Sequence, residues 1–330
     1  MSTTLKLYKR GVISPPKFVP ESIQYEVLMG STAYGVSSDS SDIDIYGFCI
    51  PPKGIVFPHL KGEILGFGKQ LKRFDQFQQH HVYLPGDKVK QYDLQIFNII
   101  KYFQLCMENN PNMIDSLFVP GNCVLACTKI GNMVRDKRKI FLHKGSWYKF
   151  KGYAFSQLRG IETKSPQMGT NRRELVEKFG YDVKFAYHVV RLISEIEQIL
   201  SEGDLDIQRN REQLKYVKEG NWTLEEVKKW FYNKEKILEE LYLTSSLQYS
   251  PDENEIKKLL LDCLEEYYGS LDQCIIESDE SLKVIEKLSA IIETFNRKQT
   301  KKSLYHKINL GKESEKWKFD YKNIKKVLGL

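Results

Sequence analysis

The chain has 330 residues, of which 41% are hydrophobic and 28% are charged, and its formal net charge is +7. This composition is typical of a soluble globular protein. The apolar runs fall far short of the roughly 20 residues that a membrane span needs, and the first residues contain no apolar signal segment. We therefore expect a cytoplasmic protein with no membrane partner.

The cysteines are scattered rather than paired. They are Cys49, Cys106, Cys123, Cys127, Cys263 and Cys274. Without an export signal, this pattern favours reduced thiols in a cytoplasm. Cys123 and Cys127 are four residues apart, but no second Cys or His pair with zinc spacing accompanies them, so we expect no structural zinc site.

The first third of the sequence predicts strands and loops. Residues 1–22 hold three prolines and indicate an irregular lead-in. Apolar runs at 24–29 and 43–50 predict two strands, and the second of them ends at a Pro-Pro pair. Residues 54–93 continue a strand-like pattern that is interrupted by glycines. Alternation at 88–93 predicts a third strand that leads directly into a helix.

From residue 94 onward the apolar spacing becomes helical. A helix is predicted at 94–108, and almost everything after residue 146 reads as helix. The amphipathic segments are 181–202, 223–243, 252–268 and 281–295. We predict an α+β fold in which a short mixed sheet with helices, residues 1–125, is followed by a helical domain, residues 126–296.

The excess positive charge lies in a separate C-terminal segment, residues 297–330. This segment holds eleven basic and three acidic residues, a net charge of +8. Aromatic residues are interleaved with the lysines, a mixture that suits single-stranded nucleic acid. A segment that packs by its aromatic rings is the alternative, and the sequence leaves both open.

The clearest chemical signal is a pair of aspartates behind a small-residue turn. Asp42 and Asp44 are two positions apart on a predicted strand, so their side chains point to the same side and repel each other. Gly30 and Ser31, just upstream, allow a phosphorylated ligand to approach the backbone closely. This combination predicts a divalent ion, Mg²⁺ or Mn²⁺, that holds a nucleoside triphosphate for nucleotidyl transfer.

The alternative for this segment is a solvated acidic loop. Against that reading, Asp44 lies between two isoleucines, where a merely solvated charge is not expected. A two-metal site needs one further carboxylate on a neighbouring strand. Asp93 is our choice, since it ends an alternating run just before a predicted helix. Asp87 is the competitor, but it follows Pro-Gly and reads as part of a turn.

Gly30-Ser31 followed by Asp42-Ile43-Asp44 resembles the signature of the DNA polymerase β nucleotidyltransferase superfamily. The longer run GSTAYGVSSDSSDID is similar, more narrowly, to predicted nucleotidyltransferases associated with RNA repair, which also occur in large tailed phages. Weaker matches follow at Asn110-Pro111-Asn112 with Leu117-Phe118, at Gly152-Tyr153-Ala154 with Gln157-Leu158, and at Lys184-x3-His188-x2-Arg191. The resemblance spans roughly residues 24–230.

The resemblance implies a polymerase β-like catalytic domain whose cleft is completed by the helical domain. It implies that Asp42 and Asp44 bind the metal, that Gly30 and Ser31 bind phosphate, and that Asp93 is the third carboxylate. In many members of the superfamily this carboxylate orients or deprotonates the attacking hydroxyl. It also implies RNA as a partner, and the host cytoplasm as the location if the protein is phage-encoded.

Three cationic residues share one helix face in this sequence. Lys184, His188 and Arg191 fall at about 0°, 40° and 340° around a helix, and no acidic residue separates them. Such a stripe could hold a triphosphate, while a solvated basic face is the alternative. The adjacent His80 and His81 would point in opposite directions on a strand, so we expect a surface loop there rather than a metal site.

The leading hypothesis is a metal-dependent nucleotidyltransferase that acts on RNA, for end modification or repair. The alternative transfers AMP to a hydroxyl of a protein or small molecule. A non-enzymatic binding protein with the same fold is a third possibility, which the intact carboxylates disfavour.

Overall fold

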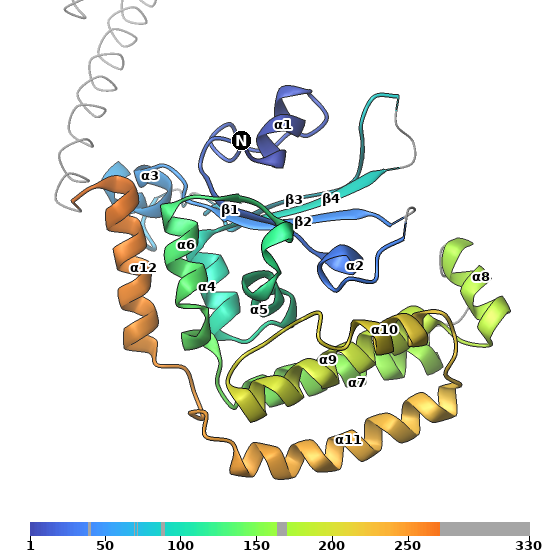
Figure 1. Ribbon diagram of the computed structural model, residues 1–330. Helices are drawn as coiled ribbons and strands as arrows, with labels where there is room; N and C mark the ends of the chain where they lie inside the picture. The colour runs from blue at the N-terminus through green and yellow to red at the C-terminus, as the bar shows by residue number, and fades with distance from the viewer. Residues whose placement is uncertain (39–40, 69, 71, 87–89, 164–169, 271–330) are drawn as a thin grey trace, which may run out of the picture. The chain divides into compact units, whose positions relative to one another are not determined.

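The computed structural model describes residues 1–38, 41–68, 70, 72–86, 90–163 and 170–270 (Figure 1). The chain divides into two compact units. One comprises Met1–Ile55 with Lys72–Gly269, and the other comprises Val56–Leu71 with Ser270–Leu330. The described part of the second unit contains the 3₁₀ helix η1 (Pro58–Lys61). The first unit holds the five strands of the sheet.

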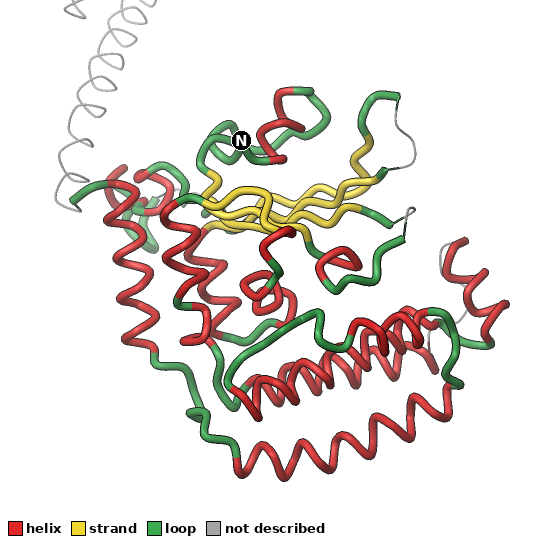
Figure 2. The backbone as a smooth tube through the Cα atoms, in the orientation of Figure 1, coloured by secondary structure: helices red, strands yellow, loops and turns green. Residues whose placement is uncertain are grey.

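The first unit is built on a five-stranded mixed sheet, which Figure 2 shows as a yellow layer. Its strands are β1 (Ile23–Leu28), β2 (Ile43–Cys49), β3 (Gln76–Tyr83), β4 (Gln91–Asn98) and β5 (Val124–Cys127), in the spatial order β3-β4-β2-β1-β5. The central pair, β2 and β4, is parallel, and the other neighbouring pairs are antiparallel. The predicted α+β fold is confirmed.

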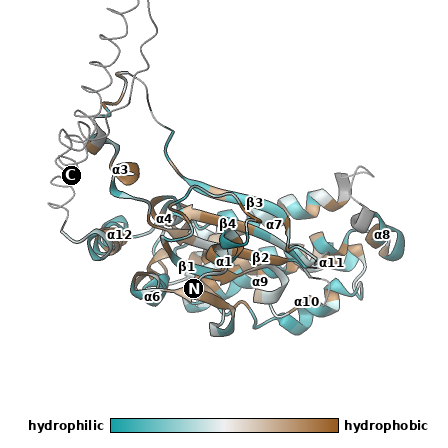
Figure 3. Ribbon diagram, turned by 90° about the horizontal axis from the view of Figure 1, so that it is seen from above, coloured by the Kyte–Doolittle hydropathy of each residue, from teal (hydrophilic) through white to brown (hydrophobic). Residues whose placement is uncertain are grey.

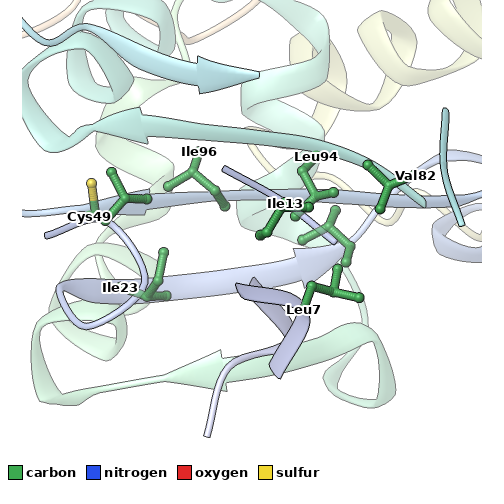
Figure 4. Close-up of a cluster of buried hydrophobic side chains, with 9 residues drawn as sticks. Leu7, Ile13, Ile23, Cys49, Val82, Leu94 and Ile96 are labelled. Atoms are coloured by element: carbon green, nitrogen blue, oxygen red, sulfur yellow. The ribbon is translucent and has the colours of Figure 1, made fainter. Parts of the chain in front are cut away.

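One face of the sheet is covered by the N-terminal segment. Residues 1–22, expected to be irregular, contain the helix α1 (Thr3–Lys9), which lies above the sheet in Figure 1. The helix forms because Ser2 caps it and the buried carboxylate of Glu26 on β1 accepts the N–H of Thr4 at 2.9 Å. Its Leu7 joins a buried cluster with side chains of β1, β2, β3 and β4 (Figure 4).

The opposite face is covered by helices α4 (Ile99–Met107), α5 (Pro111–Phe118) and α6 (Lys129–Asp136). The predicted helix at 94–108 begins later than expected, since β4 continues to Asn98, whose side chain accepts the N–H of Ile100 at 3.2 Å. Strand β4 is covered on both faces, so successive side chains at its end are buried. Its apolar run therefore does not alternate, and it resembles the pattern of a helix.

The remaining helices form most of the second half of the described chain. They are α7 (Ser146–Thr163), α8 (Thr170–Phe179), α9 (Val183–Glu202), α10 (Arg211–Lys218), α11 (Leu224–Thr244) and α12 (Glu253–Tyr268). Helices α7, α10 and α11 pack against α9, while α12 packs against α4 and α6. The predicted helices at 181–202, 223–243 and 252–268 are confirmed to within two residues at each end. The predicted helix at 281–295 and the basic segment 297–330 lie outside the described residues.

Hydropathy varies between the elements. In Figure 3 hydrophilic residues colour much of α11 and α12, and also much of the edge strand β3. Helix α9 is buried along most of its length, from Val183 to Leu200. None of the helices in the described ranges is both long enough and apolar enough to cross a membrane.

Candidate active site

The small-residue turn lies directly against Asp44. After β1 the chain enters the one-turn helix α2 (Gly30–Ala33), where Gly30 has a φ of +62°. A β-carbon at Gly30 would lie 1.9 Å from Oδ2 of Asp44, and the backbone N–H of Met29 donates to the Asp44 carbonyl at 2.8 Å. Only glycine satisfies both the backbone conformation and this approach. The turn predicted for phosphate and the carboxylate predicted for metal therefore meet at one point.

Asp44 and Asp93 are neighbours in the sheet. They are register partners on the parallel strands β2 and β4, so their side chains leave the same face of strands that run about 4.8 Å apart. Asp42, which is exposed, immediately precedes β2. Burial, followed by the charges of Asp93 and Asp42, raises the pKa of Asp44 from 3.8 to about 6. The charges of the other two predicted carboxylates thus act on Asp44.

The placement of Asp93 differs from the sequence prediction in one respect. It is the third residue of β4 and does not lie directly before a helix, because α4 begins only at Ile99. What brings Asp93 to Asp44 is the strand pairing, which relates positions far apart in the sequence. The competing candidate, Asp87, lies outside the described residues.

Asp93 is held by a bulge in β3. The backbone N–H of His81 donates to Oδ1 of Asp93 at 2.7 Å, and the side-chain amide of Gln91 donates to the same atom at 3.2 Å. Nδ1 of His80 lies 3.5 Å from Oδ2. The β3–β4 register shifts between Gln79 and Val82, and His81 adopts a φ of 56°, which is unusual for a residue other than glycine.

The sequence led us to expect His80 and His81 in a surface loop. They lie instead in strand β3. In a regular strand adjacent side chains diverge, whereas the bulge brings the His80 ring and the His81 backbone to the same carboxylate. No glycine marks this bulge, so the sequence carries no signal for it.

The donor set suits a hard divalent cation. Mg²⁺ in nucleotide sites takes one or two carboxylates and completes its shell with water and substrate phosphates. Within the described ranges, no group of three or more His, Cys, Asp or Glu side chains is placed to hold a metal ion by itself. Asp44 and Asp93 therefore fit a site of the open kind, in which a nucleotide supplies the remaining oxygen ligands.

The predicted cationic stripe on α9 divides into two parts. Lys184 is exposed at the beginning of α9, and its contact with a triphosphate stays a prediction. His188 is half-buried, with its ring 5.0 Å from that of Tyr187, and its contact with a triphosphate stays a prediction. Arg191, in contrast, is only 5% exposed.

Arg191 belongs to a buried polar network that contains Tyr34, Asp115 and Glu195. Its Nη1 donates to the hydroxyl of Tyr34 at 2.8 Å and to Glu195 at 3.1 Å, and it pairs with Asp115 of α5. Tyr34 in turn donates to Asp115 at 2.7 Å. The sequence contains no sign of this burial, since no local pattern indicates that Asp115 supplies a partner from another element. Contact of Arg191 with a triphosphate stays a prediction.

Residues 16–241 match the model of the RNA repair pathway DNA polymerase beta family. The chain belongs to this family. The match includes all five strands of the sheet, helix α2 and the helices α4 to α10. The resemblance stated from the Gly-Ser and Asp-x-Asp motifs is confirmed.

Other comparisons add little to the family assignment. A nucleotidyltransferase-like protein from Exiguobacterium sibiricum 255-15, solved by crystallography, is 10% identical over 90% of each chain, with a TM-score of 0.25. A search of curated proteins finds no match. The assignment to the RNA repair pathway DNA polymerase beta family therefore rests on the sequence motifs and on the family model.

The chemistry of this family member can be stated from its own residues. Carboxylates on the neighbouring strands β2 and β4 offer oxygen ligands. The glycine turn brings backbone directly against one of them, Asp44. Such an arrangement suits the transfer of a phosphorus group, where catalysis depends on positioning and on charge stabilisation.

Proposed function

We propose that the protein is a metal-dependent nucleotidyltransferase that transfers a nucleoside monophosphate from a nucleoside triphosphate to an acceptor hydroxyl on RNA. The observation that carries the proposal is the contact of Gly30 with Asp44, together with the pairing of Asp44 and Asp93 across β2 and β4. A phosphate-binding turn and two carboxylates then converge within one small region.

In this proposal Asp42 and Asp44 hold Mg²⁺ or Mn²⁺, and Asp93 completes the carboxylate set. The ion, when bound, neutralises the charge that develops on the triphosphate and on the leaving pyrophosphate. Gly30 and Ser31 bind phosphate oxygens through backbone N–H groups and the Ser31 hydroxyl.

Asp93 has a second role in this proposal. Its Oδ1 already accepts hydrogen bonds from His81 and Gln91, which fixes the carboxylate plane. Oδ2 is then the atom that orients the acceptor hydroxyl, or accepts its proton, as that hydroxyl attacks the α-phosphorus. The bulge in β3 supplies the His81 N–H that holds Oδ1, and Nδ1 of His80 lies 3.5 Å from Oδ2.

RNA as the acceptor is supported by two observations. The description of the family places it in RNA repair. The sequence from 297 to 330 combines a net charge of +8 with aromatic residues, a composition that suits single-stranded nucleic acid.

The test is to incubate the protein with each of the four nucleoside triphosphates, labelled at the α-phosphate, Mg²⁺ or Mn²⁺, and either cellular RNA or cellular protein. We expect label in the RNA fraction and none with Asp44→Asn. The matched control is Asp136→Asn, which removes an exposed carboxylate on α6 and should label RNA as the wild type does. Label that enters protein instead would identify the acceptor class of the alternative hypothesis.

A further inference from the structure

Helix α7 exposes aromatic and basic side chains on one face. Its rings at Tyr148, Tyr153 and Phe155 are 63%, 42% and 44% exposed. At about 100° per residue, six exposed positions fall within one arc of about 160°. We call these six residues the α7 face: Tyr148, Lys149, Gly152, Tyr153, Phe155 and Arg159. No residue from Ser146 to Ile161 is acidic, so the face carries positive charge only.

Two of the three rings are held by hydrogen bonds at their hydroxyl ends. Nδ2 of Asn110, the N-cap of α5, donates to the Tyr153 hydroxyl at 3.3 Å. The Tyr148 hydroxyl donates to the hydroxyl of Tyr242 on α11 at 3.3 Å, and the centroids of these two rings are 5.5 Å apart. Both rings therefore keep a fixed orientation while they stay exposed, which lowers the entropy cost of stacking a flat ligand on them.

Gly152 lies in the middle of α7 without a packing reason. A β-carbon at Gly152 would have no atom within 4 Å, whereas one at Gly160 of the same helix would meet the Phe185 ring of α9 at 3.3 Å. Glycine inside a helix lowers stability relative to alanine, and no neighbour requires it at position 152. Between the positions of Tyr148 and Tyr153 the helix backbone is thus open to close approach by a ligand.

Helix α7 lies on the side of the site where we expect the acceptor. Helices α7 and α10 both pack against α9, and Figure 3 shows α7 toward β3 and β4 and α10 on the opposite side of α9. Helix α10 holds the loop after the glycine turn, since Nζ of Lys218 donates to the Val36 carbonyl at 2.8 Å. Asp93, on β4, is one strand nearer to β3 than Asp44. An acceptor whose hydroxyl lies at Asp93 therefore has α7, and not α10, on its side of α9.

The charge of the α7 face favours a polyanion. Nζ of Lys149 lies 4.0 Å from Glu108, at the end of α4, and both side chains are nearly half exposed. Such a pair contributes little to stability, so a phosphate group can displace the carboxylate. Exposed rings that alternate with cations suit a single strand of nucleic acid, because every base has a face for stacking and every linkage carries a negative charge.

We propose that the α7 face binds the acceptor RNA as a single strand, with bases stacked on its three rings and phosphates bound by Lys149 and Arg159. This inference rests on the proposed function for RNA as the acceptor, and it assigns the surface along which that RNA lies. The strand passes over Gly152, where the absence of a side chain lets it approach the helix.

The test is equilibrium binding of a short, unpaired, fluorescently labelled RNA to the full chain, measured by anisotropy. We expect Tyr148→Ala, Tyr153→Ala and Phe155→Ala each to weaken binding about tenfold, because each removes a stacked base. Tyr216→Ala is the matched control, since this tyrosine is 52% exposed but lies on α10, and it should leave the affinity unchanged. Fully paired RNA should bind more weakly and should not depend on the three rings, because its bases are already stacked.

Two further variants separate RNA binding from folding. Gly152→Gln should raise the melting temperature, because glutamine favours a helix and meets no neighbour, while RNA affinity falls about tenfold as the side chain occupies the path of the strand. A weaker affinity in a more stable protein does not come from unfolding. Lys149→Gln should lower the slope of log affinity against log salt concentration by about one, as expected for the loss of one phosphate contact.

Photochemical crosslinking of RNA that contains 4-thiouridine locates the strand on the wild-type protein. We expect adducts on the α7 face. Adducts confined to residues 297–330, unchanged RNA affinity in all three ring variants, or a wild type that binds no single-stranded RNA would each overturn the proposal.

The outcomes for binding and for transfer are separable. If the ring variants bind RNA weakly but the wild type transfers no nucleotide, the proposed function fails and the RNA-binding face stands. If the ring variants label RNA as the wild type does, with an unchanged KM for the RNA, the α7 face is not the acceptor surface and the proposed function stands.

Discussion

Gly30 and Asp44 lie so close that a β-carbon on the glycine would be 1.9 Å from the aspartate Oδ2 and 2.9 Å from its Cγ. The atoms in conflict belong to the end of a side chain, which can rotate, and not to the backbone. A larger residue at position 30 would therefore displace the Asp44 carboxylate more readily than it would disrupt the sheet.

This relationship makes a prediction for Gly30→Ala. The protein should lose about 1 kcal/mol of stability from the positive φ, while nucleotide transfer should fall at least about a hundredfold as Asp44 rotates away. Gly180→Ala is the matched control, because Gly180 also has a positive φ, +79°, but nothing within 4 Å of its would-be β-carbon. It should show the loss of stability with full activity. Equal activity of the two variants would show that the Gly30–Asp44 contact has no role.

Asp44 also makes a pH-dependent prediction for the metal-free protein. Its pKa is raised from 3.8 to about 6 in the folded state, so ionisation of this group lowers stability as the pH rises between about 4 and 6. Asp44→Asn should therefore stabilise the protein at pH 8, where the wild-type carboxylate is charged, by about 2 kcal/mol.

At pH 4 the same substitution should have little effect on stability, because the wild-type carboxyl is then protonated in the folded protein. Chemical denaturation of both proteins at the two pH values, with a chelator present, measures the difference. A variant that is less stable than wild type at pH 8 would contradict the assignment of Asp44 as a carboxylate that is held for function at a cost in stability.

Asp93→Asn should separate chemistry from nucleotide binding. The substitution keeps the shape of the side chain but removes the charge that orients the acceptor hydroxyl, so kcat should fall about a hundredfold or more. At saturating Mg²⁺, KM for the nucleoside triphosphate should change by less than about threefold, because Gly30, Ser31, Asp42 and Asp44 are intact. Steady-state kinetics with a saturating acceptor measures both, and a change confined to KM would argue against this role.

The buried network makes a prediction for Arg191. Arg191→Ala would leave Asp115 and Glu195 buried without their cation, which costs about 3–5 kcal/mol. Arg209→Ala, which removes an exposed pair with Glu202, should cost at most about 1 kcal/mol. Denaturant unfolding gives both values. An unchanged stability of Arg191→Ala, with loss of nucleotide affinity, would favour the direct triphosphate contact that the sequence suggested.

The chain's own sequence predicts the part of the site that is local. The turn holds Gly30 and Ser31, and the strand segment that follows holds Asp42 and Asp44. Their spacing in the sequence is therefore enough to predict a phosphate-binding turn beside a metal-binding pair. The boundaries of α9, α11 and α12 were also predictable, because their periodicity and their caps at Asp182, Thr223 and Asp252 are continuous in the sequence.

The parts that sequence reasoning missed depend on contacts between distant segments. Asp93 does lie on the strand next to Asp44. The reason given for choosing it was a helix directly after it, and that helix begins five residues later than expected. The bulge at His81 leaves no mark in the residue types. The burial of Arg191 depends on Asp115, which lies 76 residues away.

Nucleotidyl transfer is tested most directly with nucleoside triphosphates labelled at the α- or the γ-phosphate, with RNA as acceptor and with wild-type or Asp44→Asn protein. We predict that the α-label enters RNA, that the γ-label leaves as pyrophosphate, and that Asp44→Asn transfers neither. Transfer of the γ-label to the acceptor, or equal α-labelling by Asp44→Asn, would contradict the proposed function.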